Sequence, residues 1–443
     1  SLAGAVTLAT DSTLGATNGN SLELSGTIDG ASALDILGGG TVTLGGTVGS
    51  STALASLSGA AGTALAINGG LVRTSGAQTY NGATTFGATT TLRTTAGGLI
   101  SAPGAVTATA GTLTLDTGAG DATFTNSGND FGTVAATSTS NLSLIDANAL
   151  TIGPINATGL VDIRSQSNDM ILNNAITTTS TSANAVTLIA DGAATPDATG
   201  SGGNFKNAGS AAITTGAGGA WRIYTGNPSD TIRNGLAETG KRYNVDNGSD
   251  PLATGNRIYF RIQPTLTLTA DNKTKTYGNA NPAFTYSYSG LIDSDLIATA
   301  ISSGPGYAVD GTTSTSGQLT AATLHNITPS AATATSLGYS LSYTSGALTV
   351  NQRALTIAAT GINKVYDTDA TATVTYADNR VTGDLLTIGG TAAFLDKNVG
   401  TGKTVNVNGI TLGNTDAGNY TFNTTAATSA NITAANLAVT GVT

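Results

Sequence analysis

The sequence has 443 residues, with no cysteine and one histidine, His325. The lack of cysteine excludes disulfides, thiolate metal sites and cysteine nucleophiles. A single histidine cannot form a histidine-cluster metal site, and we expect no histidine-based catalytic triad. We predict that His325 is a surface strand or loop residue with no catalytic or ligand role.

Charged residues are also scarce, at 10% against about 25% in ordinary globular proteins. The helix formers Glu, Lys, Gln and Met are few, whereas glycine alone numbers 59. Such a composition cannot build much α-helix, so it predicts an all-β fold. Disorder is the alternative for a chain rich in Gly, Ser and Thr. The regular alternation of apolar and polar residues favours ordered strands.

The net charge is −9, with a sequence pI near 4.4, and no basic cluster suggests binding to nucleic acid. No apolar run reaches the roughly 18 residues of a transmembrane helix, so we expect no membrane insertion. The sequence opens inside a repeat and not with a signal peptide, which predicts an internal piece of a longer protein. A β-rich chain without cysteine favours a bacterial exoprotein.

Residues 1–219 contain short alternating segments that recur every 20 to 25 residues or so, within the range of solenoid repeats. Examples are Ser21–Leu24, Thr41–Leu44, Asn141–Leu144 and Ala185–Leu188. Each segment places apolar residues on one face and Thr, Ser or Glu on the other. We predict a right-handed parallel β-helix stalk, in which each coil buries its apolar face against its neighbours. A pair of antiparallel β-sandwiches is the alternative.

A sharp change of composition follows at Trp221. Residues 1–220 hold 5 of the 22 aromatic residues and 4 of the 17 Lys and Arg residues. We interpret residues 220–263 as an aromatic cap and junction over the last coil, because a solenoid needs protected ends. The predicted structural cap residues are Trp221, Tyr224, Tyr243, Tyr259 and Phe260. A sugar-binding platform is the alternative role for this cluster.

Residues 264–443 contain a longer repeat. Thr265–Leu268 is followed by Lys275–Gly278, and Ala354–Ile357 by Lys364–Asp367, with the leading Leu and the Tyr 11 positions apart in both copies. The length suits small, immunoglobulin-like β-sandwich modules. We predict one module at 264–352, a second at 353–434 and the start of a further repeat at 435–443.

Because Tyr277 and Tyr366 lie at the same distance from the leading Leu of their modules, we expect them to have the same structural role. We predict that each ring fills a module edge while its hydroxyl bonds to the backbone, beside the turn residues Gly278 and Asp367. A repeated ligand contact, with both hydroxyls facing solvent, is the alternative.

These motifs resemble known families. Residues 1–219 with Gly219–Pro228 look like the β-helical stalk of filamentous-haemagglutinin-type exoproteins of two-partner secretion. Lys275–Pro282 is similar to the start of MBG domains. Lys364–Asp367 with Gly418–Tyr420 is similar to YDG domains, although Thr368 stands where that family usually has Gly. The resemblance implies export and attachment to the cell surface.

Carboxylates are the remaining candidates for chemistry. A β-helix enzyme needs clustered Asp or Glu beside Arg or Lys, and Asp162, Arg164 and Asp169 are the one local group in the stalk. We interpret it as a surface ion pair. The pairs Asp293/Asp295 and Asp367/Asp369 could offer oxygens to Ca²⁺, but turn formation is our preferred interpretation. We therefore predict no catalytic residue, metal site or cofactor.

The predicted function is a structural or adhesive protein, secreted or on the bacterial cell surface, whose stiff stalk presents repeat modules. Expected partners are host or bacterial surface glycans or proteins, or copies of the chain joined head to tail. The main alternative is a subunit of an extracellular filament or matrix fibre, and a carbohydrate-active β-helix enzyme is the less favoured one.

Overall fold

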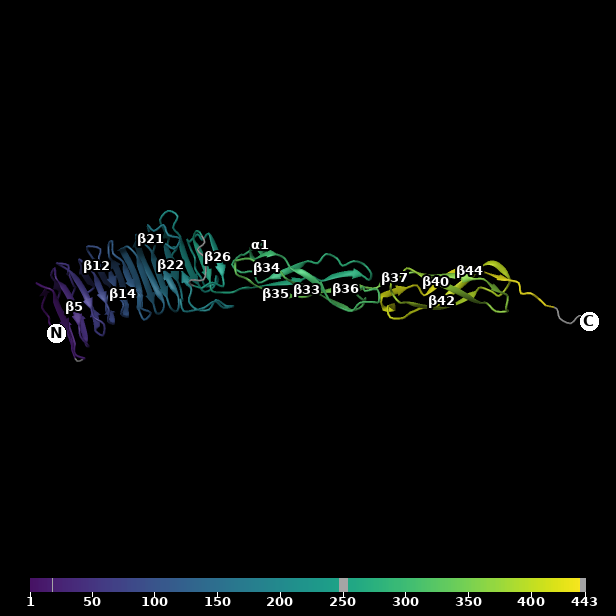
Figure 1. The fold of residues 1–443 in the computed structure, drawn as a ribbon, viewed down its shortest axis with the longest axis horizontal. Coiled ribbons are helices and arrows are strands. Elements are labelled where there is room, and N and C mark those ends of the chain that lie inside the picture. Colours follow the sequence, from purple (N-terminus) through teal and green to yellow (C-terminus); the bar gives the residue numbers. More distant parts are fainter. Residues whose placement is uncertain (18, 247–253, 439–443) are drawn as a thin grey trace, which may run out of the picture. The chain divides into compact units, whose positions relative to one another are not determined.

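The computed structural model describes residues 1–17, 19–246 and 254–438. Within them the chain is nearly all β, as the composition predicts (Figure 1). It forms two compact units. The first comprises Ser1–Thr265, Gly290–Ser302 and Ala334–Ser340, and the second comprises Leu266–Ser289, Ser303–Thr333 and Leu341–Thr443. Parts of the expected junction (247–253) and of the expected further repeat (439–443) lie outside the described residues.

Parallel strands stacked along two large sheets make up most of the first unit, which is a parallel β-helix. One sheet runs, in order of pairing, through β2 (Ser12–Gly15), β5 (Ala33–Leu37), β7 (Ser56–Gly59), β10 (Gln78–Tyr80), β13 (Ile100–Ser101), β15 (Ala122–Phe124), β17 (Leu142–Asp146), β19 (Val161–Ser165), β22 (Val186–Ile189), β25 (Trp221–Thr225), β27 (Arg257–Phe260) and β26 (Gly240–Tyr243).

The second sheet runs through β3 (Ser21–Leu24), β6 (Thr41–Leu44), β8 (Ala64–Ile67), β11 (Thr84–Phe86), β14 (Val106–Asp116), β16 (Asp130–Thr139), β18 (Leu150–Ala157), β20 (Met170–Leu172) and β23 (Phe205–Lys206). Strands β9 (Leu71–Thr74), β12 (Thr90–Thr94), β21 (Ile176–Thr178) and β24 (Ile213–Thr214) branch from it, and β1 (Val6–Thr7) pairs with β4 (Ile28–Asp29).

The coil length agrees with the repeat that the sequence predicts. Ser12 pairs with Leu34, and Gln78 pairs with Ile100, so each of these coils takes 22 residues. The pairing is parallel throughout both sheets, which rules out antiparallel sandwiches across residues 1–219. Alternation sets the core: in β5, Leu34 and Ile36 are fully buried while the residues between and beside them are more exposed.

Glycine is abundant partly because successive coils touch backbone to backbone at one corner. A Cβ on Gly26 would lie 2.2 Å from the carbonyl oxygen of Gly4, and one on Gly69 would lie 2.0 Å from that of Gly46. No side chain fits such a gap. The corner therefore requires glycine for close approach, beyond the positive φ that Gly70 shows at the same turn.

Polar residues inside the β-helix satisfy backbone groups at the turns. The side-chain amide of Asn129 donates to the carbonyl oxygens of Phe124 and Ile145, both at 3.0 Å. Asp146, fully buried, accepts from the N–H of Phe131 at 2.7 Å and of Asn148 at 3.0 Å. Its burial outweighs these hydrogen bonds and raises its pKa to about 6.

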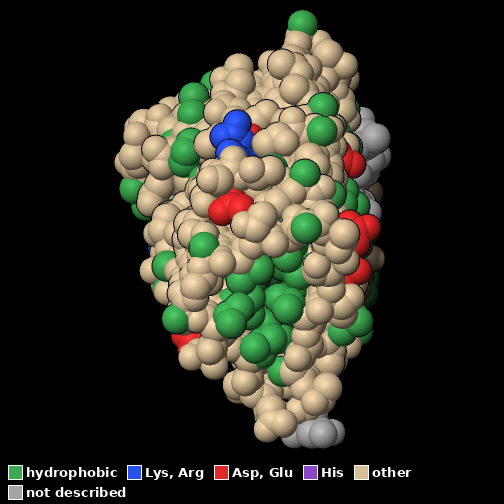
Figure 2. Space-filling model, turned by 90° about the vertical axis from the view of Figure 1, so that its left-hand side faces the viewer, with side chains coloured by type: hydrophobic (Ala, Val, Ile, Leu, Met, Phe, Trp, Pro, Cys, Tyr) green, Lys and Arg blue, Asp and Glu red, His purple; other side chains and the backbone are tan. Residues whose placement is uncertain are grey.

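The N-terminal end of the β-helix exposes part of its interior. Leu2 is 53% exposed, and Val6, Leu14 and Leu22 of the first coil are only half-buried. Figure 2 shows apolar side chains gathered at the centre of this end and surrounded by polar surface. The equivalent side chains one coil further, Ile28, Ile36 and Val42, are completely covered.

The first module contains two main sheets. One has β30 (Tyr286–Ser289), β28 (Thr265–Ala270) and β35 (Ser340–Thr344), and the other has β29 (Lys273–Thr276), β36 (Gly346–Asn351), β33 (Leu324–Ser330) and β32 (Gly306–Val309). A short helix, α1 (Ile297–Ala300), precedes the pair β31 (Ile301–Ser303) and β34 (Thr333–Ala334).

The second module has a sheet of six strands in the order β38 (Ile357–Ile362), β40 (Thr371–Asp378), β41 (Thr387–Phe394), β42 (Gly400–Gly413), β44 (Thr425–Thr433) and β39 (Lys364–Val365). Strand β37 (Arg353–Leu355) pairs with β43 (Tyr420–Phe422) after the short helix η1 (Ala417–Asn419). One apolar cluster, including Ala270, Leu348, Leu355 and Val407, runs through both modules.

We predict that the β-helix becomes more stable as the pH falls from 7 to 5. Because the folded-state pKa of Asp146 is about 6 and that of an unfolded Asp is about 3.9, the folded state binds the proton more tightly. The free energy of unfolding should rise by about 1 kcal/mol over this interval. Trp221, the one tryptophan, lies in the β-helix, so its fluorescence during urea unfolding measures this unit.

The matched control is Asp146→Asn, which should abolish this pH dependence whatever its effect on absolute stability. The only histidine lies in the second unit and does not contribute. An equal slope in both proteins would show that Asp146 is ionised when folded at pH 5.

Candidate functional site

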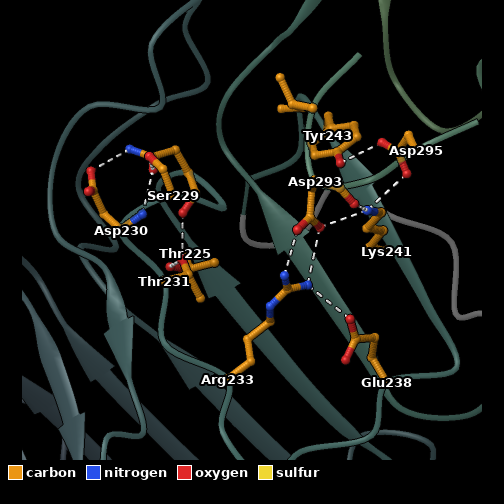
Figure 3. Close-up of polar contacts among 12 residues, drawn as sticks. Thr225, Ser229, Asp230, Thr231, Arg233, Glu238, Lys241, Tyr243, Asp293 and Asp295 are labelled. Carbon is orange, nitrogen blue, oxygen red and sulfur yellow. Dashed lines mark hydrogen bonds and ion pairs between the residues drawn. The ribbon is translucent and has the colours of Figure 1, made fainter.

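A polar hollow in the first unit lies where the last strands of the β-helix meet the segment Gly290–Ser302 (Figure 3). It has a volume of about 710 Å³. Its lining residues are Thr231, Ile232, Arg233, Asn234, Leu236, Glu238, Lys241, Asp293 and Ser294.

Charged side chains in this hollow form one connected network. Arg233 places its two terminal nitrogens 2.6 and 3.2 Å from the carboxylate oxygens of Asp293, and one of them is also 2.9 Å from Glu238. Lys241 bridges Asp293 at 2.7 Å and Asp295 at 2.9 Å. Asp293 and Ser294 both have positive φ, which turns the chain sharply between the two carboxylates.

Two tyrosines complete the network. The hydroxyl of Tyr243 donates to Asp295 at 2.7 Å, and that of Tyr339 donates to the same oxygen at 2.9 Å. Their rings meet edge to face, with centroids 5.4 Å apart. Burial, reinforced by the carboxylate, raises the pKa of Tyr243 and brings that of Tyr339 to about 12, so both hydroxyls remain proton donors at neutral pH.

This arrangement is suited to holding the segment and not to catalysis. Burial alone would raise the pKa of Asp293, but hydrogen bonds from Arg233 and Lys241 outweigh it and keep the pKa below its usual value. An ionised carboxylate fixed between two cations is a poor general acid and a weak base. We call these residues (Arg233, Glu238, Lys241, Tyr243, Asp293, Asp295 and Tyr339) the ionic latch.

The aromatic residues predicted as a cap are all buried. Tyr224 and Tyr259 stack with centroids 4.7 Å apart, and Tyr243 and Phe260 stack at 5.5 Å. The guanidinium of Arg233 lies 5.8 Å from the centre of the Phe260 ring. Stacking follows from the parallel register, which places Tyr224 opposite Tyr259 on adjacent strands.

Trp221 does not plug the last coil as we expected. It belongs to β25, which pairs in parallel with β22 on one side and β27 on the other. The strand at the end of the sheet is β26, so Tyr243 lies at the edge while Trp221 fills an internal coil. The sequence of residues 220–263 is thus continuous with the β-helix in the part that the structure describes.

The repeated tyrosines take structurally equivalent places. Strand β29 pairs in parallel with β36, and the N–H of Tyr277 then donates to Asn351; β39 pairs in parallel with β44, and the N–H of Tyr366 donates to Thr433. Both rings pack on their module cores, Tyr277 fully buried and Tyr366 half-buried.

The hydroxyl of Tyr277 differs from expectation, because it bonds to a side chain of the following module. It lies 2.8 and 2.7 Å from the two carboxylate oxygens of Asp384, which also accepts from Tyr420. The rings of Tyr277 and Tyr420 meet edge to face at 5.4 Å. Gly278 has a φ of 79°, and a Cβ there would lie 2.6 Å from a methyl of Val381. We call this contact the tyrosine joint.

A second carboxylate and an amide support the tyrosine joint. Asp416 accepts from the N–H and hydroxyl of Thr315 in the first module, and from the N–H of Leu385 in its own module at 2.8 Å. The side-chain oxygen of Asn419 accepts from the N–H of Ala321 at 2.7 Å. Three polar side chains of the second module therefore bind the first.

The other predicted residues have local roles. Asp367 and Asp369 both pair with Lys364, at 2.8 and 3.0 Å. Thr368, where Gly is usual in the family it resembles, has a φ of 79°. A β-branched residue is strained in this conformation, which explains the preference for Gly.

His325 is buried, contrary to our prediction of a surface position. It lies in β33, where alternate residues face the core. Its Nε2 is 2.9 Å from the carbonyl oxygen of Thr320, and its Nδ1 is 3.2 Å from that of Asp310. In the stalk, Arg164 bonds Asp162 at 2.8 Å on the surface, while Asp169 pairs with Lys206 at 2.6 Å.

Sequence reasoning missed the latch cations and Asp384. Arg233 and Asp293 are 60 positions apart, and Tyr277 and Asp384 are 107 apart, so no local spacing connects them. The one available signal was the concentration of Lys and Arg after Trp221. Among the described residues, no group of three or more His, Asp or Glu side chains is placed to hold a metal ion.

Comparisons with known families identify both modules. Residues 266–349 match the MBG domain (YGX type), and residues 351–430 match the YDG domain. Domains of these kinds are non-catalytic and structural, and they occur in surface-associated, adhesin-like proteins. No curated protein and no solved structure matches the chain. The described residues include no helix long and apolar enough to cross a membrane.

We predict that Asp293→Asn releases the segment Gly290–Ser302 from the β-helix. The substitution leaves Arg233 and Lys241 partly buried with fewer acceptors, which should cost about 2 kcal/mol. Amide hydrogen exchange in this segment should accelerate accordingly. Asp162→Asn, which breaks a more exposed pair in the same unit, is the matched control and should change little. Unchanged exchange in both variants would mean that the latch does not hold the segment.

Thr368→Gly should stabilise the second module by about 1 kcal/mol, because glycine removes the strain of a left-handed threonine. Thr373→Gly, the same change inside strand β40, should destabilise it by a similar amount. Chemical unfolding of both variants tests the pair. Stability lowered equally by the two substitutions would show that Thr368 is not strained.

Proposed function

We propose that the chain is a structural and adhesive part of a bacterial exoprotein, secreted or held at the cell surface. In this proposal the β-helix is a stalk and the MBG and YDG domains are the modules that it presents. The matches to surface-associated, adhesin-like domains support this function. Export by a two-partner secretion route is proposed with it, on the resemblance of the β-helix to filamentous-haemagglutinin-type stalks.

The observation that carries the proposal is that the polar side chains of the ionic latch and the tyrosine joint connect one part of the fold to another. Arg233, Lys241, Asp293 and Asp295 hold one segment on the end of the β-helix, and Asp384 with Asp416 holds one module on the next. Each of these groups connects elements that lie far apart in the sequence. A protein that presents modules at a distance needs such fixed connections.

An enzyme uses its polar groups differently. A β-helix glycosidase or lyase needs a carboxylate free to exchange a proton with the substrate. The carboxylates of the ionic latch are engaged by Arg233, Lys241 and two tyrosine hydroxyls. Asp162 and Arg164, the other candidates, form a partly exposed ion pair on strand β19. These contacts support a role without catalysis.

A filament subunit is the second candidate, in which head-to-tail contacts between copies would bury the half-buried Val6, Leu14 and Leu22 and the exposed Leu2. A preceding coil of a longer chain would bury the same side chains, so their exposure does not favour the filament over the stalk.

We expect adhesion to depend on multivalency. Beads coated densely with the full chain should attach to mucin-coated surfaces, while the free chain should bind the same mucin too weakly to compete at micromolar concentration. Beads coated with an unrelated protein of equal net charge are the control, because the chain carries a net charge of −9. Attachment should vary steeply with coating density.

Two outcomes would contradict this function. Fibres formed by the purified chain in electron micrographs, and lost in the variant Leu14→Asp, would identify a filament subunit. New reducing ends or unsaturated sugars released from polysaccharides would identify an enzyme.

A further inference from the structure

The MBG domain contacts the YDG domain through the end that carries Tyr277. Strand pairing shows that the end of the YDG domain that carries Tyr366 is the equivalent one. In the MBG domain, Thr276 pairs with Asn351, and Tyr277 follows. In the YDG domain, Val365 pairs with Thr433, and Tyr366 follows. Each tyrosine thus stands where the last strand of its module ends and the chain continues.

The two ends differ in what covers them. Tyr277 is fully buried, with its ring against Tyr420 and its hydroxyl on Asp384 of the next module. Tyr366 is only half-buried, and its hydroxyl has no hydrogen-bond partner within the described part of the chain. One end is occupied and the other is open.

Large apolar side chains are exposed around Tyr366. Val365 is 58% exposed, Leu395 69% and Val399 55%. Register places them together: Lys364 and Gly400 both pair with Ile432, and the N–H of Leu395 donates to Thr404 on the same strand as Gly400. We call Ile362, Val365, Tyr366, Leu395 and Val399 the distal face.

The sequence beyond the distal face repeats the entry into the YDG domain. Leu355 comes four residues after Asn351 and is buried in the core shared by the two modules. Leu437 comes four residues after Thr433 and is 88% exposed. Leu437 has the spacing of a core residue but no core around it.

We propose that the distal face docks a further module of this repeat, which the chain enters through Leu437. The docked module supplies a carboxylate to the hydroxyl of Tyr366, as Asp384 does to Tyr277, and covers Val365, Leu395 and Val399. The choice of occupant rests on continuity with the tyrosine joint, whose two halves are both in this chain. It does not depend on the adhesive function.

The test is a chain in which residues 1–433 are followed by a second copy of residues 352–443. This places a copy of Asp384 where the proposal requires a carboxylate. Tyr366→Phe and Asp→Asn at the copied position form a double-mutant cycle in chemical unfolding. We expect a coupling of about tenfold in the unfolding equilibrium constant, because a hydrogen bond to a charged group contributes about that much.

Calibration comes from Tyr277→Phe with Asp384→Asn in the unextended chain, which measures the existing tyrosine joint. Tyr366→Phe in the unextended chain is the matched control and should have little effect, since its hydroxyl has no partner there. Hydroxyl-radical footprinting provides a second readout. Labelling of Val365, Leu395 and Val399 should fall several-fold when the copy is present.

A folded copy without coupling and with unchanged footprinting would overturn the proposal. A copy that stays unfolded would also overturn it, because docking on Tyr366 should give it the surroundings that residues 352–433 have behind Tyr277. If the unextended chain self-associates in sedimentation experiments and Val365→Asp abolishes this, a second copy of the chain is the occupant instead.

Discussion

Stacking is the constraint on which this structure depends, because within the described residues most of the apolar core is buried between neighbouring coils or between the two modules. In the β-helix, Leu34 is covered by coils on both sides, whereas Leu14 in the first coil is half-buried. In the second unit, Leu348 and Leu355 share a core across the boundary between two modules. Contacts between neighbouring coils or modules therefore provide much of the stability. The last coil or module of a stack leaves apolar side chains exposed.

The two polar connections follow from that constraint. The ionic latch joins Asp293 and Asp295 to the last strands of the β-helix, and the tyrosine joint connects Tyr277 to Asp384. Both use a carboxylate that accepts hydrogen bonds from two tyrosine hydroxyls. A tyrosine can cover apolar side chains with its ring and still present a donor at its tip. The same arrangement of one carboxylate and two tyrosines therefore occurs at both connections.

Features that repeat at short intervals along the chain could be predicted from the sequence. Alternation identified the buried face of strands such as Ser21–Leu24, coil length followed from their recurrence, and the shared spacing of Tyr277 and Tyr366 anticipated equivalent places. Hydrogen-bond and ion-pair partners that lie far apart in the sequence could not be predicted. Asp293 and Asp295 have an adequate local explanation as turn residues, so nothing in their neighbourhood pointed to Arg233. His325 was misplaced because one polar residue among alternating strand positions gives no sign of which face it occupies.

Carboxylates at such joints add a specificity that apolar contact lacks. An apolar face such as that formed by Val365 and Leu395 can be covered in several orientations at similar cost. Asp384 restricts the choice, because leaving a buried carboxylate without its hydroxyl donors is expensive. The second carboxylate, Asp416, and Asn419 add contacts to Thr315 and Ala321, so an orientation of the modules must satisfy all three side chains to avoid this cost. Apolar burial supplies the attraction between modules, and the polar groups determine their register.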